Sequence, residues 1–366
     1  MNSQYCLVVL AHFFGVFLAL RTFFYIAPHF LTDFIACAVT LATTALVGCF
    51  TFQFTKKKWL NDRVQSDGKA VLITGCDRGF GHATAIHLDS LGYHVFASCL
   101  FPTGPGAEEL KNKRSSHLQV LEMDITKDES VQKALEFVKE NLGTSELWAV
   151  VNNAGILKGL SVELTPMQDF QDAIEVNLYG HIRVAKAFLP LLRQSKGRLV
   201  NFTSLIGRVV LPHMTAYTVS KFGAVGFTEC LRQEMDVWGV SVISIEPEIY
   251  KTGLTDTNHL NKYMETTLNN LDESIKSDYG EKYLKQLEKM TYYFFSFASD
   301  KTQTVVDAMV SAVTLEHPEK VYRPRRNAII RGLFFVFQNF PLAVKDIFIK
   351  FYPYVAIWEN LKPASK

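Results

Sequence analysis

Residues 70–81 read AVLITGCDRGFG, and this stretch decides the fold of the chain. Its first four residues form a short apolar run, which is typical of a buried parallel strand. A helical pattern of apolar residues then continues to Gly92. We expect Gly75 to allow a tight turn, Gly79 to let the backbone approach a pyrophosphate, and Gly81 to let the helix pack closely on the strand. The order of strand, glycine turn and helix predicts a dinucleotide site at the helix N-terminus.

Apolar strand patterns and helical patterns alternate along the rest of the chain body. Strands are expected at 93–98, 118–123, 147–151, 198–202 and 240–245, and helices at 131–140, 170–192 and 216–237. Regular alternation of this kind predicts an α/β fold with a Rossmann-type, doubly wound parallel sheet.

Tyr217 and Lys221 lie four residues apart on an expected helix, so their side chains share one face. An ammonium beside a phenol favours the phenolate, and we therefore expect Lys221 to lower the pKa of Tyr217 from about 10 toward neutrality. A tyrosine tuned in this way exchanges a proton with an alcohol near neutral pH. Ser204 follows an expected strand, and its hydroxyl is placed to bind a substrate oxygen.

These motifs together resemble the short-chain dehydrogenase/reductase family over roughly residues 69–255. The matching segments are the T-G-x-x-x-G-x-G turn at 74–81, N-N-A-G at 152–155 and Y-x-x-x-K at 217–221, with Ser204 and Asn177 in the family's serine and asparagine positions. Further segments, at 104–110, 147–150 and 188–192, are similar to the membrane-bound 17β- and 11β-hydroxysteroid dehydrogenases. They are also similar to the retinol and 3-hydroxybutyrate dehydrogenases.

The resemblance implies a role for each matching residue. Tyr217 would be the general acid/base, Lys221 would lower its pKa and hold the nicotinamide ribose, Ser204 would orient the substrate oxygen, and Asn177 would fix a water in a proton relay. The cofactor would be bound by the turn and by the strand ends: Gly75, Asp77, Arg78, Gly79, Phe80, Gly81, Asp124, Asn152, Gly155 and Thr252.

One position departs from the family pattern, which usually has Pro-Gly where this chain has Pro247-Glu248. A glutamate there would either disturb the nicotinamide end of the cofactor or point to solvent. If the glutamate disturbs the cofactor, the chain could instead be a protein of another class, a non-catalytic nucleotide-sensing membrane scaffold.

The choice of cofactor depends on the residues near the end of the second strand, Ser98-Cys99-Leu100, which contribute neither an acid nor a base. Asp77 would repel a 2′-phosphate, whereas Arg78 would attract one. We expect NAD, with NADP as the alternative.

The N-terminal segment is strongly apolar. Residues 34–54 form an uncharged run long enough to span a bilayer, and Lys56, Lys57 and Lys58 follow it. Residues 5–20 form a second apolar run, which could be another span, an interfacial helix or a signal peptide. The positive flank predicts an uncleaved anchor with the catalytic domain in the cytosol. The resemblance implies the membrane of the endoplasmic reticulum, with a mitochondrial membrane as the alternative.

The charge distribution divides the remaining chain. Residues 320–366 contain nine Lys/Arg against Asp346 and Glu359, whereas residues 55–319 have a net charge of −5. We therefore expect an anchor at 1–54, a linker at 55–68, a catalytic domain at 69–320 and a basic, aromatic, membrane-associated tail at 321–366. A net charge of +2 for the whole chain excludes a global basic field for nucleic acid.

Other residues give little indication of a further site. The six cysteines have no C-x-x-C spacing, and the histidines near the glycine turn are not grouped, so no metal site is expected. Met290 and Tyr292–Phe295 could line a lipophilic pocket or simply pack in the core. The sequence therefore predicts a membrane-anchored dehydrogenase of a lipophilic secondary alcohol, a hydroxysteroid, with retinol or 3-hydroxybutyrate as alternatives. The family also implies a homodimer.

Overall fold

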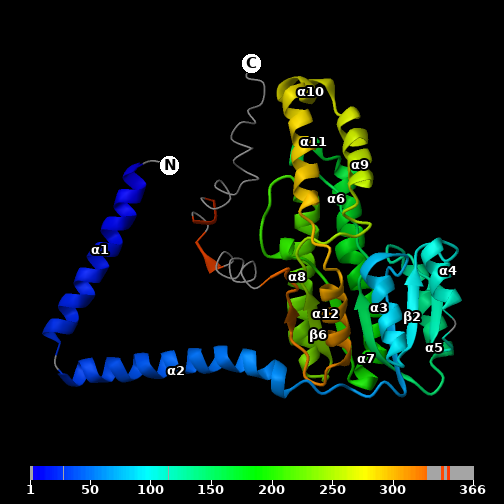
Figure 1. Cartoon of the computed structure of the whole chain (residues 1–366), viewed down its shortest axis with the longest axis horizontal. Helices are drawn as coiled ribbons and strands as arrows, with labels where there is room; N and C mark the ends of the chain where they lie inside the picture. Colours follow the sequence, from blue (N-terminus) through cyan, green and yellow to red (C-terminus); the bar gives the residue numbers. More distant parts are fainter. Residues whose placement is uncertain (1–2, 28, 114, 328–338, 342–343, 347–366) are drawn as a thin grey trace. The chain divides into compact units, whose positions relative to one another are not determined.

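The computed structural model describes residues 3–27, 29–113, 115–327, 339–341 and 344–346, and it divides into two units, Met1–Asp62 and Arg63–Lys366. The first unit consists of two helices, α1 (Ser3–Ile26) and α2 (His29–Trp59) (Figure 1). Because α2 runs to Trp59, the first residues of the predicted linker are helical. The second unit contains the predicted catalytic domain.

Within α2, His29–Phe52 is the one helix of the described residues that is long and apolar enough to cross a membrane. Its mean hydropathy is 2.0, and none of the most apolar window is buried in the protein. The hydroxyls of Thr40, Thr43 and Thr51 donate to carbonyls four residues earlier, at 2.7–2.9 Å. These polar groups are therefore satisfied within the helix, as a hydrocarbon environment requires. The apolar part of α1, Phe13–Ile26, is shorter.

The second unit is built on a seven-stranded sheet in the order β3-β2-β1-β4-β5-β6-β7, with every pair of neighbouring strands parallel. The predicted Rossmann-type sheet is confirmed. Its strands are β1 (Lys69–Ile73), β2 (His94–Cys99), β3 (Leu118–Glu122), β4 (Glu146–Asn152), β5 (Arg198–Phe202), β6 (Ser241–Ile245) and β7 (Val321–Tyr322).

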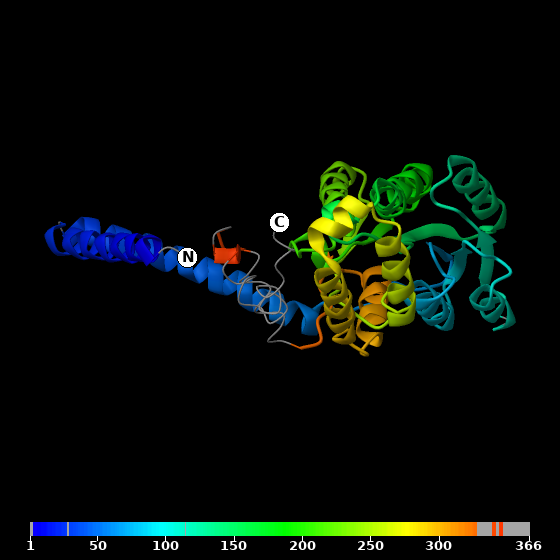
Figure 2. The same ribbon diagram turned by 90° about the horizontal axis from the view of Figure 1, so that it is seen from above.

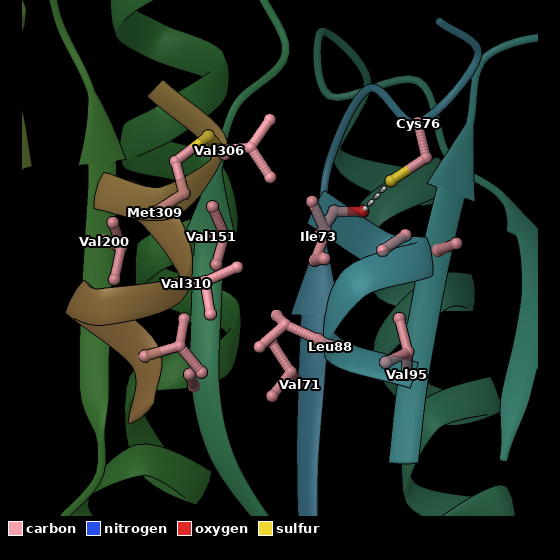
Figure 3. Packing of buried hydrophobic residues seen from close by; sticks show 14 of the residues in the cluster. Val71, Ile73, Cys76, Leu88, Val95, Val151, Val200, Val306, Met309 and Val310 are labelled. Carbon is pink, nitrogen blue, oxygen red and sulfur yellow. Dashed lines mark hydrogen bonds between the residues drawn. The ribbon is translucent and has the colours of Figure 1, made fainter. Parts of the chain in front are cut away.

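Helices cover both faces of this sheet (Figure 2). On one face, Val71 and Ile73 of β1 pack with α3 (Gly79–Ser90), α4 (Pro105–Asn112) and α12 (Gln303–Thr314). Figure 3 shows this cluster, in which the Cys76 thiol donates to the Ile73 carbonyl at 3.3 Å. On the other face, Ala70 and Leu72 pack with α5 (Asp128–Asn141), α7 (His181–Ser195) and α8 (Thr215–Asp236). Alternate residues of one strand thus supply both cores.

Three further helices gather at one end of the unit: α9 (Thr257–Asn269), α10 (Glu273–Tyr279) and α11 (Glu281–Ser296) (Figure 1). They pack on one another through their own cluster, which includes Met264, Leu287 and Met290. The short helices η1 (Val162–Leu164), α6 (Met167–Ile174), η2 (Glu175–Gly180) and η3 (Leu205–Gly207) complete the fold.

The first residues of the predicted tail belong to the body. Val321 and Tyr322 form β7, which pairs with β6, and Arg323 donates to the fully buried Glu246 at 2.9 Å. Arg325 donates to the Glu246 carbonyl at 2.5 Å. The start of the basic segment is therefore bound to protein carboxylates and carbonyls. Most of the predicted interfacial tail, 328–338 and 347–366, lies outside the described residues.

Candidate active site

The glycine turn between β1 and α3 has the geometry of a phosphate cradle. Gly79 has a φ of +71°, and a Cβ there would have no heavy atom within 4 Å, so the backbone is open to a ligand. A Cβ on Gly81 would lie 2.4 Å from the Asn153 amide nitrogen and 2.6 Å from the Gly75 oxygen, so only glycine fits. Arg78, the N-cap of α3, has extended backbone and makes no side-chain cap hydrogen bond. The first N–H groups of α3 can therefore bind an anion.

The two charged residues of the turn point to opposite sides of it. The Asp77 carboxylate accepts from the Leu100 and Phe101 backbone N–H groups, at 3.0 and 2.8 Å, and so lies at the end of β2. Arg78 lies against Gly253 in the segment after β6, because a Cβ on Gly253 would be 2.9 Å from its Nε. A negative charge is thus placed where the ribose of a dinucleotide binds in this fold.

Aromatic packing fixes Phe80 behind the turn. Its ring centroid lies 5.5 Å from that of Phe202 and 6.2 Å from that of Tyr250. The turn is therefore packed against the end of β5 and the segment after β6.

Two predicted cofactor residues are occupied by protein contacts. Asn152 is fully buried, and its amide donates to the His181 carbonyl at 3.1 Å and to the Asn201 side chain at 2.9 Å. Asp124 accepts from the backbone N–H and hydroxyl of Thr126, at 3.0 and 2.7 Å, and these bonds lower its pKa despite partial burial. Asn152 thus links the end of β4 to β5 and α7 within the core, whereas Asp124 remains partly exposed after β3.

Tyr217, Lys221 and Ser204 lie together above the sheet. The Lys221 Nζ donates to the Phe202 carbonyl at 3.0 Å and lies 5.7 Å from the centroid of the Tyr217 ring. Ser204, at the end of β5, is 7% exposed and hydrogen-bonds Tyr217, a contact that lowers the pKa of the phenol. A Cβ on Gly155 would lie 3.8 Å from Nζ, so the N-N-A-G segment closes the other side of this group.

Asn177 lies on η2, a π-helical segment inside the long helix α6-η2-α7, and is fully buried. Its side chain accepts from the Ile156 N–H at 2.9 Å and donates to the Ile156 carbonyl at 2.9 Å and the Ser220 hydroxyl at 3.0 Å. The π-bulge thus directs this amide toward the segment after Gly155 and the helix that contains Tyr217. Such bulges are frequent at functional sites.

The pKa values of the central pair differ from the sequence prediction. Burial raises the pKa of Tyr217 to about 12, although Ser204 opposes the shift, and burial lowers the pKa of Lys221 to about 7. The reason is that both side chains are removed from water, and removal from water favours the neutral form of each. Burial thus favours the phenol form of Tyr217 and weakens the protonated form of Lys221.

A cavity that the sequence did not locate opens next to this centre. Its empty volume is about 400 Å³, including the part that opens to solvent, and Met214, Leu260 and Phe295 of its wall also pack with Tyr217. The lining is mostly apolar: Leu157, Lys158, Gly159, Leu160, His213, Met214, Leu260, Tyr263, Met264, Thr291, Phe294 and Phe295. Of the aromatic run that we considered as pocket lining, Phe294 and Phe295 contribute, whereas Tyr292 and Tyr293 are about half exposed.

The polar groups of this cavity are bound to one another. The Lys158 Nζ donates to Asp169 at 2.9 Å and to Asp172 at 2.6 Å, and these bonds raise the pKa of Lys158 against its partial burial. The Tyr263 hydroxyl donates to Asp169 at 2.6 Å. His213 pairs with the Ser161 hydroxyl, and burial lowers its pKa to about 3, so it is neutral. We call Lys158, which lines the cavity, and its partners Asp169 and Asp172, which do not, the charged rim; their formal charges sum to −1.

Glu248 points neither to solvent nor into the cavity. Its side chain is 5% exposed and binds Arg326, accepting from the backbone N–H and from Nε, the latter at 3.2 Å. Of the two interpretations of Glu248, the one in which its side chain points to solvent is therefore wrong. The reason is that Arg326 was assigned to a separate tail, whereas it packs against the segment after β6. Thr252, in the same segment, accepts from the Leu254 N–H at 3.3 Å.

These features fit a nicotinamide dinucleotide, since the glycine cradle, the uncapped helix and the buried lysine meet at one edge of the sheet. Bound there, the cofactor would supply the hydride donor or acceptor. With the cofactor bound, Ser204 would be placed to bind the substrate oxygen, Tyr217 to exchange a proton with that oxygen, and the apolar wall to exclude water. Among the described residues, no group of three acidic, histidine or cysteine side chains could hold a metal ion.

Comparison with known proteins agrees with this geometry. The family model for short chain dehydrogenases matches residues 69–262. Estradiol 17-beta-dehydrogenase 2 of Mus musculus is 38% identical over 84% of this chain and 81% of that protein. Mitochondrial D-beta-hydroxybutyrate dehydrogenase of Rattus norvegicus is 39% identical over 74% of this chain and 80% of that protein, and retinol dehydrogenase 7 of Mus musculus is 36% identical over 89% and 99%.

Solved structures show the same fold. A short chain dehydrogenase/reductase from Burkholderia phymatum in complex with NAD superimposes with a TM-score of 0.61 at 19% identity, covering 83% of this chain and 99% of that one. A short chain dehydrogenase from Burkholderia cenocepacia in complex with NADP superimposes with a TM-score of 0.57 at 22% identity, covering 77% of this chain and 97% of that one. With the family model over more than half of its length and relatives above 35% identity, the chain belongs to the short-chain dehydrogenase family and is an oxidoreductase.

Proposed function

We propose that this enzyme interconverts a neutral, lipophilic secondary alcohol and its ketone, with a hydroxysteroid as the substrate and NAD as the hydride acceptor. The cavity beside Tyr217 supports this substrate class. Its wall is mostly apolar, and the lysine in its lining, Lys158, is paired with Asp169 and Asp172. We assign Tyr217, Lys221, Ser204 and Asn177 as the catalytic residues.

The same rim argues against 3-hydroxybutyrate, although a relative that acts on it is similar to this chain. A carboxylate substrate needs a cation that faces it. Lys158, the lysine among the cavity-lining residues, already donates to two carboxylates, and His213 is neutral. An anion would therefore have to compete with two carboxylates for Lys158.

For the cofactor, we propose that the Asp77 carboxylate at the end of β2 disfavours the 2′-phosphate of NADP. Arg78 does not offset this effect, because its side chain lies against Gly253 on the β6 side of the turn. Replacing Asp77 with Asn should narrow the ratio of kcat/KM between NAD and NADP. A wild-type enzyme with the higher kcat/KM for NADP would contradict the assignment.

We also propose that the chain is a membrane protein of the endoplasmic reticulum with its catalytic unit in the cytosol, and that it forms a homodimer. His29–Phe52 is long enough to span, and Lys56–Lys58 follow it. Protease added to sealed microsomes should digest residues 63–327 without detergent. Full protection until detergent is added would place the catalytic unit in the lumen, and import into mitochondria would support the alternative compartment.

The central experiment is turnover by the full chain in vesicles with estradiol, retinol and 3-hydroxybutyrate, each with NAD and with NADP. We expect oxidation of estradiol with NAD at the highest kcat/KM. Faster oxidation of retinol would support the function named for retinol dehydrogenase 7. Faster oxidation of 3-hydroxybutyrate would contradict the argument from the rim.

A further inference from the structure

Helix α11 exposes three aromatic side chains near its C-terminal end. Tyr292 is 51% exposed, Tyr293 49% and Phe297, the C-cap, 52%. The rings of Tyr293 and Phe297 pack edge to face with centroids 4.7 Å apart, so they form one surface. We call these three residues the aromatic patch. Large aromatic side chains exposed together mark an interaction surface more often than single exposed apolar residues do.

The aromatic patch alternates along the chain with residues of the substrate cavity. Thr291, Phe294 and Phe295 line the cavity, and Phe295 is 6% exposed. A helix turn of 3.6 residues places these side chains on one face of α11 and the aromatic patch on the other. The width of one helix therefore separates the cavity from whatever covers the aromatic patch.

Exposed basic residues lie before and after the patch in the chain. Lys285 precedes Tyr292 by two turns and Lys289 by one turn, and Lys301 follows Phe297 in the chain. Lys285 shares a salt bridge with Glu281 at 2.5 Å, at the end of α11 that is distant from the patch. Tyrosine and phenylalanine beside lysine are the residues that proteins place at the boundary between lipid headgroups and acyl chains.

We propose that the aromatic patch lies in the headgroup region of the bilayer, so that a lipid-dissolved substrate enters the cavity past α11 without crossing water. The bilayer is the favoured occupant because the same chain has a helix able to span a membrane and because the flanking lysines complement anionic headgroups. Residues 328–366 are a less suitable cover, since they contain five Lys/Arg against two acids. The identity of the substrate rests on the proposed function, but the contact with lipid does not.

The first experiment tests the contact without activity. The full chain is reconstituted in vesicles of phosphatidylcholine and phosphatidylserine that contain a photoactivatable phosphatidylcholine, and the labelled peptides are identified by mass spectrometry. We expect labelling within 289–301, as well as within α2. The C-terminal end of α8, with Val237 83% and Trp238 50% exposed, is the internal control, because it lies about 30 Å along the helix from Tyr217.

Labelling of α2 but not of 289–301 would overturn the proposal. So would cross-links from 289–301 to a second copy of the chain or to residues 328–366, because either would identify a protein cover.

The second experiment uses the variant Tyr292→Ser/Tyr293→Ser/Phe297→Ser, matched by Val237→Ser/Trp238→Ser. In vesicles, the patch variant should raise the KM for estradiol about tenfold while kcat and the KM for NAD stay within twofold. The kinetics for the water-soluble alcohol cyclohexanol should be unchanged, and the matched variant should behave as wild type. An unchanged KM for estradiol, or an equal loss with cyclohexanol, would overturn the entry route. If the wild type is labelled at 289–301 but oxidises neither alcohol, the proposed function fails while the lipid contact stands.

Discussion

Two lysines near the same cavity have opposite environments. Lys221, in the centre, is 3% exposed and donates to a backbone carbonyl, and burial lowers its pKa to about 7. Lys158, at the rim, is partly exposed and donates to Asp169 and Asp172, and those carboxylates raise its pKa. Burial therefore weakens the protonated form of the lysine in the centre, whereas two carboxylates stabilise the protonated form of the lysine at the rim.

The comparison shows two different tasks that a lysine side chain can perform in a protein. A lysine without a carboxylate partner responds to changes in its surroundings, and such groups are typical of proton-transfer sites. A lysine between two carboxylates is fixed in charge, and it orders the segment after Gly155 against α6. We infer that the centre determines the rate of the reaction and that the rim determines which substrates enter.

The largest expected effect is in the centre, on replacing Tyr217 with Phe. The ring and its packing remain, but the proton that the substrate oxygen exchanges is removed. We expect kcat to fall by at least about 10³, which corresponds to about 4 kcal/mol of barrier, with the Kd for NAD nearly unchanged. Turnover close to that of the wild type in the purified variant would exclude Tyr217 as the general acid/base.

The sequence predicted the sheet and the phosphate cradle because both follow from local patterns. A short apolar run and three glycines are contained in residues 70–81. Gly75 and Gly81 have no room for a Cβ, and Gly79 has a positive φ. The family motifs likewise locate Ser204, Tyr217 and Lys221, which the fold brings together.

The cavity could not be predicted in the same way, because its wall comes from four segments far apart in the chain, 157–160, 213–214, 260–264 and 291–295. The pKa of Tyr217 was mispredicted because the spacing of two residues contains no information on how deeply both are buried. Glu248 was misread for a related reason. Its partner Arg326 is 78 residues away and was assigned to the tail by composition.

The next effect is on stability and compares two buried histidines: His181, which contacts the Ala154 carbonyl, and His213, which lines the cavity. Burial lowers the pKa of both His181 and His213 to about 3, from an ordinary value near 6.5. Between pH 3 and 6.5 the unfolded chain therefore binds more protons than the folded one, so stability is complete above pH 6.5 and is lost as the pH falls. We expect a loss of about 1.4 kcal/mol per pH unit for the fully buried His181, and less for His213, which is nearer to solvent.

Denaturant unfolding of the detergent-solubilised chain between pH 5 and 7.5 measures this effect. His181→Gln keeps a donor for the Ala154 carbonyl, which the histidine contacts at 2.8 Å, and should flatten the pH dependence more than His213→Gln does. The exposed His259→Gln is the matched control and should leave the slope unchanged. An equal pH dependence in wild type and His181→Gln would show that His181 is not the source of acid sensitivity.

The smallest effect tests whether the rim excludes anions. Asp172 is partly exposed, and it accepts from Lys158 at 2.6 Å and from Gln168 at 2.7 Å. Replacing it with Asn changes the net charge of the rim from −1 to zero while Asp169 still holds Lys158 and Tyr263. We expect the KM for 3-hydroxybutyrate to fall about threefold, since a partly exposed pair contributes less than about 1 kcal/mol. The KM for estradiol, which is uncharged, should stay within twofold.

Glu163→Gln removes one exposed carboxylate that binds Tyr279 rather than Lys158, and it controls for the overall change in charge. A similar fall in that variant would mean that the general field of the protein, and not the rim, disfavours anionic substrates.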